Sequence, residues 1–420
     1  MGSVRYPLFA MILTWGLLLL GSESKTHSGD VQVLKELKQG LEPGSVNPGS
    51  CVSSWDFTLD PCDNLLSEKF TCGFRCDVVV SGLSRVTELA LDQAGYAGSL
   101  NNLTWNLPYL QTLDISHNYF SGQIPDSFSN LTRLSRLSLS SNSFSGEIPA
   151  SLGTLSNLEK LYLDNNNLRG TIPQGFANLK TLELQSNNLN TRLSNLASLG
   201  TLEYLDLSDN AVSGEFPPSL PFSLVQISIR NNNLSGVLTR KSFEKLTRLQ
   251  VVDLSSNRMS GSVPSLLFEL PSLQQLTLSF NEFTNVEAPY KGVESRSGLV
   301  AVDLSNNRLR GWLPSFMAAM PRLSSLSLEN NELTGRIPTG LGVKTVFPGK
   351  GVAALERLLL GGNYLVGGIP RPLLALKRDS ANVSLGDNCL YRCPRSFFFC
   401  QGPQQKSLVL CNRFTPPSSP

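Results

Sequence analysis

Apolar and polar residues follow one recurring pattern along most of this chain, L-x-x-L-x-L-x-x-N-x-L-x-G-x-I-P. Clear copies occupy residues 110–125, 134–149 and 158–173. The L-x-L core has a period of two, which places its leucines on one face of a short strand and the intervening residues on the other. Each copy therefore predicts a strand, a sharp turn and a return segment shaped by Gly and Pro.

The asparagine of the pattern returns at intervals of 21 to 32 residues. It occupies positions 118, 142, 166, 187, 210, 232, 257, 281, 307, 331, 363 and 388, and a further copy beginning at Val86 has Ala94 in its place. Asparagine tolerates tight turns, and its amide can satisfy buried backbone groups as both donor and acceptor. One coil cannot bury its own apolar face, so the pattern predicts about thirteen stacked coils.

The two ends of the array are marked by cysteines, four at each end. They are Cys51, Cys62, Cys72 and Cys76, then Cys389, Cys393, Cys400 and Cys411. Before them, Arg5 and a run of mostly apolar residues at 8–20 are typical of a secretory signal peptide. Export favours disulfides over zinc sites, although the Cys-x3-Cys spacings resemble those of zinc ligands. Each group of four allows three pairings, and the sequence does not choose among them.

An amphipathic stretch at 30–41 precedes the first cysteines. It predicts a helix with Asp30 as its N-cap and with Val31, Leu34, Leu37 and Leu41 on one face.

These features together resemble the plant extracellular leucine-rich-repeat family. The G-x-I-P return leg, Trp55, the Asp-Pro-Cys at 60–62 and the Gly73-x-x-Cys76 motif carry the resemblance, which is closest to receptor-like protein ectodomains and secreted polygalacturonase inhibitors. It implies an α/β repeat solenoid, a right-handed superhelix of about 12–13 coils with a parallel β-sheet on its concave face and disulfide-stapled caps. The implied divisions are a signal peptide at 1–24, an N-terminal cap at 25–85, repeats at 86–388, and a C-terminal cap and tail at 389–420.

The chain departs from the family pattern in three places. Residues 341–354 lengthen the coil between Asn331 and Asn363, and residues 284–298 replace the G-x-I-P leg after Asn281. Family receptors usually continue into a membrane helix or a kinase, which this sequence does not show after Cys411. We therefore expect a secreted protein in the cell wall or apoplast, or held peripherally at the plasma membrane surface.

Composition and motifs argue against several function classes. With 35 basic and 33 acidic residues, the net charge of +2 gives no global attraction to nucleic acid or anionic membranes. The two histidines, His27 and His117, are accompanied by no nucleophile elbow, phosphate loop or metal cluster. We therefore predict a protein that is not an enzyme and needs neither cofactor nor metal.

Recognition is expected on the outward positions of the concave sheet. Aspartates in L-D-L strand cores, such as Asp114 and Asp206, are interpreted as solubilising scaffold. Large or charged outward side chains are better candidates, because aromatic and arginine residues dominate binding hot spots. The predicted ligand-binding residues are Arg136, Lys160, Tyr162, Glu183, Tyr204, Arg230, Phe280, Glu329 and Arg357.

Two surface features complete the picture. Four sequons, at Asn102, Asn130, Asn233 and Asn382, are candidate glycosylation sites, and the first three are expected to lie off the concave strands. From residue 371 onward, seven basic residues face only two acidic ones. That excess suggests a solvated cap or retention on an acidic wall polysaccharide such as pectin.

The favoured function is a receptor-like module that recognises a protein or peptide, in signalling or defence, beside a membrane-bound receptor kinase. The first alternative is an inhibitor of a microbial wall hydrolase such as polygalacturonase. The second is a wall adaptor without a discrete ligand. Because concave side chains vary on a fixed scaffold, the sequence does not name the ligand.

Overall fold

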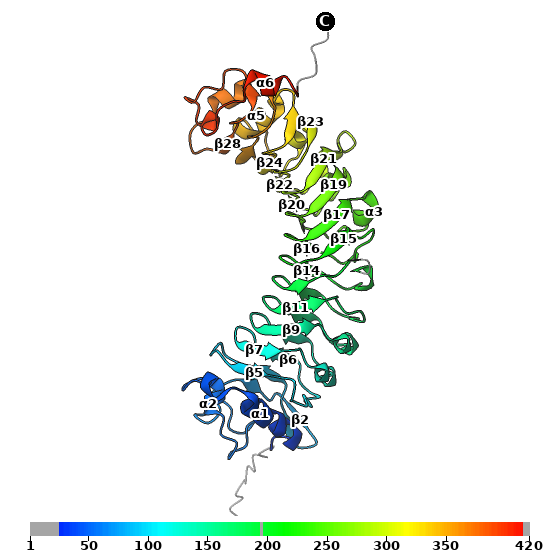
Figure 1. The fold of residues 1–420 in the computed structure, drawn as a ribbon, viewed down its shortest axis with the longest axis vertical. Helices are drawn as coiled ribbons and strands as arrows, with labels where there is room; N and C mark the ends of the chain where they lie inside the picture. The colour runs from blue at the N-terminus through cyan, green and yellow to red at the C-terminus, as the bar shows by residue number, and fades with distance from the viewer. Residues whose placement is uncertain (1–24, 194–195, 415–420) are drawn as a thin grey trace, which may run out of the picture.

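One long sheet runs through the computed structural model of the protein, which describes residues 25–193 and 196–414 (Figure 1). The predicted signal peptide lies outside the described residues. This main sheet has 14 strands, and all neighbours pair in parallel except the antiparallel pair β1 and β4. Its strands are β1 (Phe74–Arg75), β4 (Glu88–Ala90), β6 (Thr112–Asp114), β8 (Arg136–Ser138), β10 (Lys160–Tyr162), β12 (Thr181–Glu183), β14 (Tyr204–Asp206), β16 (Gln226–Ser228), β18 (Val251–Asp253), β20 (Gln275–Thr277), β22 (Ala301–Asp303), β24 (Ser325–Ser327), β26 (Arg357–Leu359) and β28 (Asn382–Ser384).

The leucines of the L-x-L cores form the interior, as the alternation predicts. Leu113, Leu137 and Leu161 are fully buried at the centres of successive strands, and their registers align coil on coil. The core is one continuous column from the N-terminal helix to Cys400. Since every coil covers the apolar face of the next, the predicted stacked solenoid of thirteen coils is confirmed.

The asparagine ladder connects each coil to the one before it. Asn166 donates through Nδ2 to the carbonyl oxygens of Leu139, Leu163 and Asp164 at 3.0–3.2 Å, and its Oδ1 accepts from Phe144 N at 2.9 Å. Equivalent bonds recur at the other ladder asparagines. The amide thus satisfies backbone groups at a turn that no strand partner reaches.

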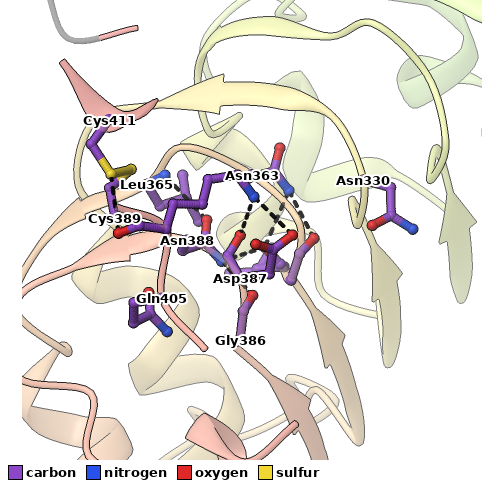
Figure 2. Close-up of polar contacts among 12 residues, drawn as sticks. Asn330, Asn363, Leu365, Gly386, Asp387, Asn388, Cys389, Gln405 and Cys411 are labelled. Atoms are coloured by element: carbon purple, nitrogen blue, oxygen red, sulfur yellow. Dashed lines mark hydrogen bonds and ion pairs between the residues drawn. A yellow bond between two sulfur atoms is a disulfide. The ribbon is translucent and has the colours of Figure 1, made fainter. Parts of the chain in front are cut away.

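The ladder ends on a glutamine that the repeat pattern does not predict. Gln405 Oε1 accepts from Leu390 N at 3.1 Å and its Nε2 donates to the Leu385 carbonyl, so it takes the place of a next asparagine. Lys406 pairs with Asp387 at 2.8 Å. Figure 2 shows the Cys389–Cys411 disulfide next to the last ladder asparagine, Asn388. The C-terminal cap therefore makes the hydrogen bonds to the preceding coil that the ladder asparagine of one more coil would make.

Shorter sheets follow the turns on the flank of the main sheet. One comprises β5 (Ala97–Ser99), β7 (Tyr119–Gly122), β9 (Ser143–Glu147), β11 (Asn167–Gly170) and β13 (Asn188–Leu189), and the next comprises β15 (Ser213–Glu215), β17 (Asn233–Val237), β19 (Arg258–Val263) and β21 (Glu282–Val286). Three pairs complete the set: β23 (Arg310–Trp312) with β25 (Glu332–Thr334), β27 (Val366–Gly367) with β29 (Cys389–Leu390), and the N-terminal hairpin β2 (Val78–Val80) with β3 (Leu83–Arg85).

Helical segments are short and occupy the caps and return legs. The α-helices are α1 (Ser28–Gly40), α2 (Cys51–Ser54), α3 (Arg240–Phe243), α4 (Leu266–Glu269), α5 (Thr339–Val346) and α6 (Leu408–Cys411). The 3-10 turns are η1 (Pro43–Ser45), η2 (Asp126–Asn130), η3 (Ala150–Thr154), η4 (Leu196–Ser198), η5 (Val293–Arg296), η6 (Ser315–Ala319), η7 (Arg371–Ala375) and η8 (Phe398–Cys400). Among the described residues, none of these helices is long and apolar enough to cross a membrane.

The N-terminal helix begins earlier than predicted. It starts at Ser28, and the N-cap is His27, whose Nδ1 accepts from Gly29 N at 3.1 Å. Asp30 is not the cap, because its carboxylate is buried and forms a two-bond pair with Arg85 at 2.7 and 3.0 Å. A buried charge needs such a partner. Val33, rather than Val31, completes the buried face.

The structure resolves the cysteine pairings that the sequence leaves open. All eight cysteines form disulfides, namely Cys51–Cys72, Cys62–Cys76, Cys389–Cys411 and Cys393–Cys400. In the N-terminal cap, the Trp55 indole lies so close to Gly73 that a β-carbon there would approach Trp55 to 2.7 Å. The Gly73-x-x-Cys76 motif therefore requires glycine at its first position.

The lengthened coil between Asn331 and Asn363 folds into α5 and a loop. Lys344 of α5 is buried, and its Nζ donates to the carbonyl oxygens of Met320 and Ala353 at 2.8 and 2.9 Å. Burial lowers the pKa of Lys344 to about 8, because the interior disfavours the ammonium form. The inserted residues are thus tied to the preceding coil.

Candidate functional site on the main sheet

The nine predicted ligand-binding residues all lie on the main-sheet strands or in the turns directly after them. Five occupy adjacent strands: Arg136 on β8, Lys160 and Tyr162 on β10, Glu183 on β12 and Tyr204 on β14. The other four are separated, with Arg357 on β26 and Arg230, Phe280 and Glu329 in turns after β16, β20 and β24. The structure therefore brings five of the nine together.

A guanidinium is already held within this group. The Arg136 guanidinium carbon lies 4.5 Å from the centre of the Tyr162 ring, and Nη2 lies 3.7 Å from an Asp114 carboxylate oxygen. The outward positions of β6, β8 and β10 thus form an acid–arginine–tyrosine series. Carboxylates and aromatic faces both attract a guanidinium.

The next two strands continue this series with acidic and aromatic residues. The registers align Tyr162 with Glu183 and Glu183 with Asp206, and Tyr204 lies two residues before Asp206 with 43% of its surface exposed. We call Tyr162, Glu183, Tyr204 and Asp206 the tyrosine–carboxylate surface. Within residues 25–193 and 196–414, neither Glu183 nor Asp206 forms an ion pair with a lysine or arginine.

The carboxyl group of Glu183 is half-buried. Desolvation raises its pKa, and the nearby Asp164 and Asp206 carboxylates act in the same direction. A hydrogen bond from Gln185 Nε2 at 3.4 Å and the positive charge of Arg136 act in the opposite direction, and the pKa remains raised. In the free protein, the interactions that stabilise the ionised carboxylate are thus too weak to offset its desolvation and the neighbouring negative charges.

The aspartates interpreted as scaffold stabilise the turns that follow their strands. Asp114, Asp206, Asp253 and Asp303 each accept a hydrogen bond from the backbone N–H two residues later, at 2.8–3.1 Å. Such a bond fixes the turn that follows the strand. Asp206 is also aligned with Glu183 on the neighbouring strand. Its carboxylate can therefore take part in binding as well as fix the turn.

Phe280 has an unusual backbone conformation. The residue before each ladder asparagine is left-handed, and in the other described coils it is His, Ser, Asn, Asp or Gly. Phe280 adopts φ +55° there and remains 57% exposed. Large side chains disfavour this conformation, and exposure gives no packing in return. Arg230, another predicted residue two strands away in the turn after β16, forms an ion pair with Asp209 at 3.0 Å.

Several large exposed residues were not predicted from the sequence, and Trp312 is one of them. Trp312 on β23 is 83% exposed on the flank, between two hollows of about 260 and 550 Å³. Its ring packs against Gly335 of the next coil. The sequence signal was a tryptophan at the variable position of a G-x-I-P leg. It was not among the predicted residues because those were sought only at outward positions of the concave sheet.

The sequons lie in two settings. Asn102, Asn130 and Asn233 are exposed away from the main sheet, as the sequence predicts. Asn382 is exposed on β28, the last main-sheet strand. A glycan on Asn382 would therefore extend from the C-terminal edge of the main sheet.

Comparisons with known proteins agree with this architecture. Profiles described as "Leucine rich repeat" match residues 108–168, 222–283, 201–222 and 322–343. The chain is a leucine-rich-repeat protein. Its repeats are of the plant extracellular type, and its sequence is 33% identical to receptor-like protein 41 of Arabidopsis thaliana over 107 residues, 24% of this chain and 12% of that protein.

Other relatives share parts of this leucine-rich-repeat chain. Mouse lumican is 36% identical over 103 residues, which are 24% of this chain and 30% of lumican. The chain thus matches about a third of lumican and about an eighth of the receptor-like protein.

Two solved structures resemble the fold. The plant peptide hormone receptor RGFR1 in complex with RGF2 is 29% identical with a TM-score of 0.66, over 72% of this chain and 48% of that one. A TDR receptor is 31% identical with a TM-score of 0.62, over 72% and 52%.

Proposed function

We propose that this leucine-rich-repeat protein is an extracellular, non-catalytic recognition scaffold whose main sheet binds a peptide or an extended protein segment. The binding region is the stretch β8–β14. Four disulfides support an extracellular location, because such bonds persist in oxidising compartments. We further propose the division into signal peptide, N-terminal cap, repeats and C-terminal cap at the boundaries given above.

The observation that carries the proposal is the cluster of exposed and half-exposed aromatic and charged side chains on β8–β14. The inward leucines hold every coil in the same way, so the fold does not require Tyr162, Glu183 or Tyr204 at these positions. Solvent-exposed tyrosines between charged groups are typical of binding hot spots. One of the similar proteins, RGFR1, is a plant peptide hormone receptor, which supports a peptide as ligand.

The test is to pan a random peptide library, displayed on phage, against the secreted protein. Selected peptides should bind the wild type and lose at least about tenfold in affinity for Tyr204→Ala, as expected for an aromatic hot spot. The matched control is Gln275→Ala, which changes the same strand position on β20. Selected peptides that bind both variants as well as wild type, or no selected peptides at all, would overturn the proposal.

A receptor kinase at the cell surface is the partner we propose for signalling or defence. Affinity capture from plant membranes, followed by mass spectrometry, tests that partner. Recovery of a receptor kinase by the wild type but not by Tyr204→Ala supports it, and recovery by both variants contradicts a role for the main sheet.

The C-terminal cap supports a second binding activity, retention on acidic wall polysaccharide. Within the cap and the last coil before it, six basic side chains are exposed and have no ion pair among the described residues; they are Arg371, Lys377, Arg378, Arg392, Arg395 and Arg413. Lys406 is instead paired with Asp387. Binding to immobilised pectin should fall steeply with added salt, and elution at unchanged low salt would contradict it.

Inhibition of a microbial polygalacturonase remains the alternative function. It is tested by adding the protein to the fungal enzyme and measuring residual activity. A stoichiometric loss of activity would favour inhibition over the receptor-like function.

A further inference from the structure

The outward face of the main sheet is acidic, although the whole chain carries a net charge of +2. Outward positions are the first and third residues of each parallel strand and the residue two places beyond. Nine carboxylates occupy them: Glu88, Asp92, Asp114, Asp164, Glu183, Asp206, Asp253, Asp303 and Glu329. The basic residues at these positions are Arg136, Lys160, Arg230 and Arg357.

Two of these carboxylates, Glu183 and Asp206, lie on the strands that also carry or adjoin the outward tyrosines. Arg136 shows how this face holds a cation, since its guanidinium lies against the Tyr162 ring and near the Asp114 carboxylate. One and two strands further along, Glu183 and Asp206 stand beside Tyr162 and Tyr204. The same two kinds of group recur there. Arg136 and Arg230 act on Glu183 and Asp206 only at longer range, and in the described part of the chain neither carboxylate forms an ion pair.

We propose that the tyrosine–carboxylate surface binds a positively charged side chain of the peptide ligand, a guanidinium or an ammonium. This inference rests on the proposed function. The ligand residue takes the role that Arg136 plays toward Asp114, with Glu183 and Asp206 as its carboxylate partners. The two tyrosine rings flank the charge and exclude water from it, which strengthens both the ion pair and the cation–aromatic contact.

The burial and the raised pKa of Glu183 agree with this assignment. Its carboxylate is half-buried beside two other acids, which raises its pKa in the free protein. A bound cation supplies the missing charge, so binding should favour ionisation of Glu183 and release a proton near that pKa.

An acidic sheet face on which Glu183 and Asp206 form no ion pair among the described residues favours a cationic ligand by charge complementarity and disfavours an acidic one. An acidic peptide or a uronate polysaccharide on this face would place like charges together over β12 and β14. Those ligands therefore belong to the outcomes that contradict the inference.

The experiment uses peptides selected on the wild-type protein. Enriched peptides should share an arginine or lysine at a fixed position, and replacing it with uncharged citrulline or norleucine should cost at least about tenfold in affinity. The double variant Glu183→Gln/Asp206→Asn should lose a similar factor for the basic peptide and little for the uncharged one.

The matched control is Asp253→Asn/Asp303→Asn. Asp253 accepts a backbone N–H two residues later, as Asp206 does. It therefore reports any loss that comes only from the turn, and a thermal melt of both double variants checks that each is folded. Affinity for the basic peptide should be unchanged in this control.

The outcomes separate the inference from the proposed function. Selected peptides that need Tyr204 but are neutral or acidic overturn the cation site and leave main-sheet recognition standing. Equal losses in both double variants also overturn it. Peptides that bind independently of Tyr204, or an absence of enrichment, overturn both.

Discussion

The stretches β8–β14 and β18–β24 have the same backbone and very different outward side chains. Both have fully buried central aliphatic residues, both carry an unbroken asparagine ladder, and both pair strictly in register. The first stretch presents Arg136, Lys160, Tyr162, Glu183 and Tyr204. At the same positions the strands of the second stretch present no aromatic or basic residue; they have uncharged residues at 251, 275, 277, 301, 325 and 327, and the carboxylates of Asp253 and Asp303.

This difference separates the residues that the fold requires from the outward side chains that it does not require. The ladder and the L-x-L cores are constant, so they account for stability in both stretches. Outward aromatic and basic residues occur on the strands of one stretch only, since Phe280 and Glu329 of the second lie in turns, and they are therefore not needed to build a coil. If recognition uses the main sheet, β8–β14 is where the chain has specialised for it.

The largest expected effect should be equal in the two stretches. Asn187 and Asn281 each donate to three carbonyl oxygens and accept one backbone N–H. Replacing either with alanine leaves several buried polar groups unsatisfied, so each variant should lose about 3 kcal/mol of unfolding free energy. Urea unfolding measures this loss, and a much smaller loss in one stretch would contradict a uniform scaffold.

Binding should separate the two stretches. Tyr162→Ala should weaken a library-selected peptide by about tenfold or more, because it removes aromatic contact area. Thr277→Ala changes the corresponding position on β20 and should alter affinity by less than about twofold. Isothermal titration of the peptide measures both, and equal weakening would refute a specialised β8–β14.

A smaller effect concerns pH. The raised pKa of Glu183 means that the folded state binds this proton more tightly than the unfolded chain, so the ionised carboxylate costs stability above its folded pKa. That cost disappears as pH falls through the folded pKa toward the ordinary value of 4.5. Glu183→Gln should therefore stabilise the protein at pH 7, by less than about 1 kcal/mol since water screens the half-exposed group.

The control for pH is Asp303→Asn in the second stretch. Asp303 accepts the Ser305 N–H at 2.9 Å, so its replacement removes a charge-assisted bond and should not stabilise the protein at pH 7. Urea midpoints at pH 7 and near pH 4 measure both variants. A Glu183→Gln gain that persists undiminished at the lower pH contradicts the assigned cause.

The smallest effect is expected from the small residues of the second stretch. Ala301→Ser and Ser325→Ala should each change stability by no more than about 0.5 kcal/mol and leave peptide affinity unchanged. Thermal melts and titrations check this. A clear loss of affinity at either position would extend the binding region beyond β14.

The repeat made most of the fold predictable from sequence. Leucine alternation and the asparagine spacing determine the strands, their order and the buried ladder, because each coil needs the same contacts. The disulfide pairing and the Asp30–Arg85 contact were not predictable, since they depend on how distant segments meet. Gln405 was missed because it completes the ladder from outside the repeat pattern.

The candidate site was predictable only in part. Arg136, Tyr162, Glu183 and Tyr204 could be singled out because the period of two marks them as outward. Their grouping required the register of β8–β14, which uneven coil lengths hide. Asp206 was set aside as scaffold, and only its alignment with Glu183 shows its second environment.

The most direct test of main-sheet recognition is site-specific photo-crosslinking. Benzoylphenylalanine is placed at Tyr204 in one protein and at the corresponding Gln275 in another, and each is irradiated with a library-selected peptide. The account predicts a crosslinked product from position 204, competed by unlabelled peptide, and none from position 275. Crosslinking from position 275 alone, or equally from both, would contradict it.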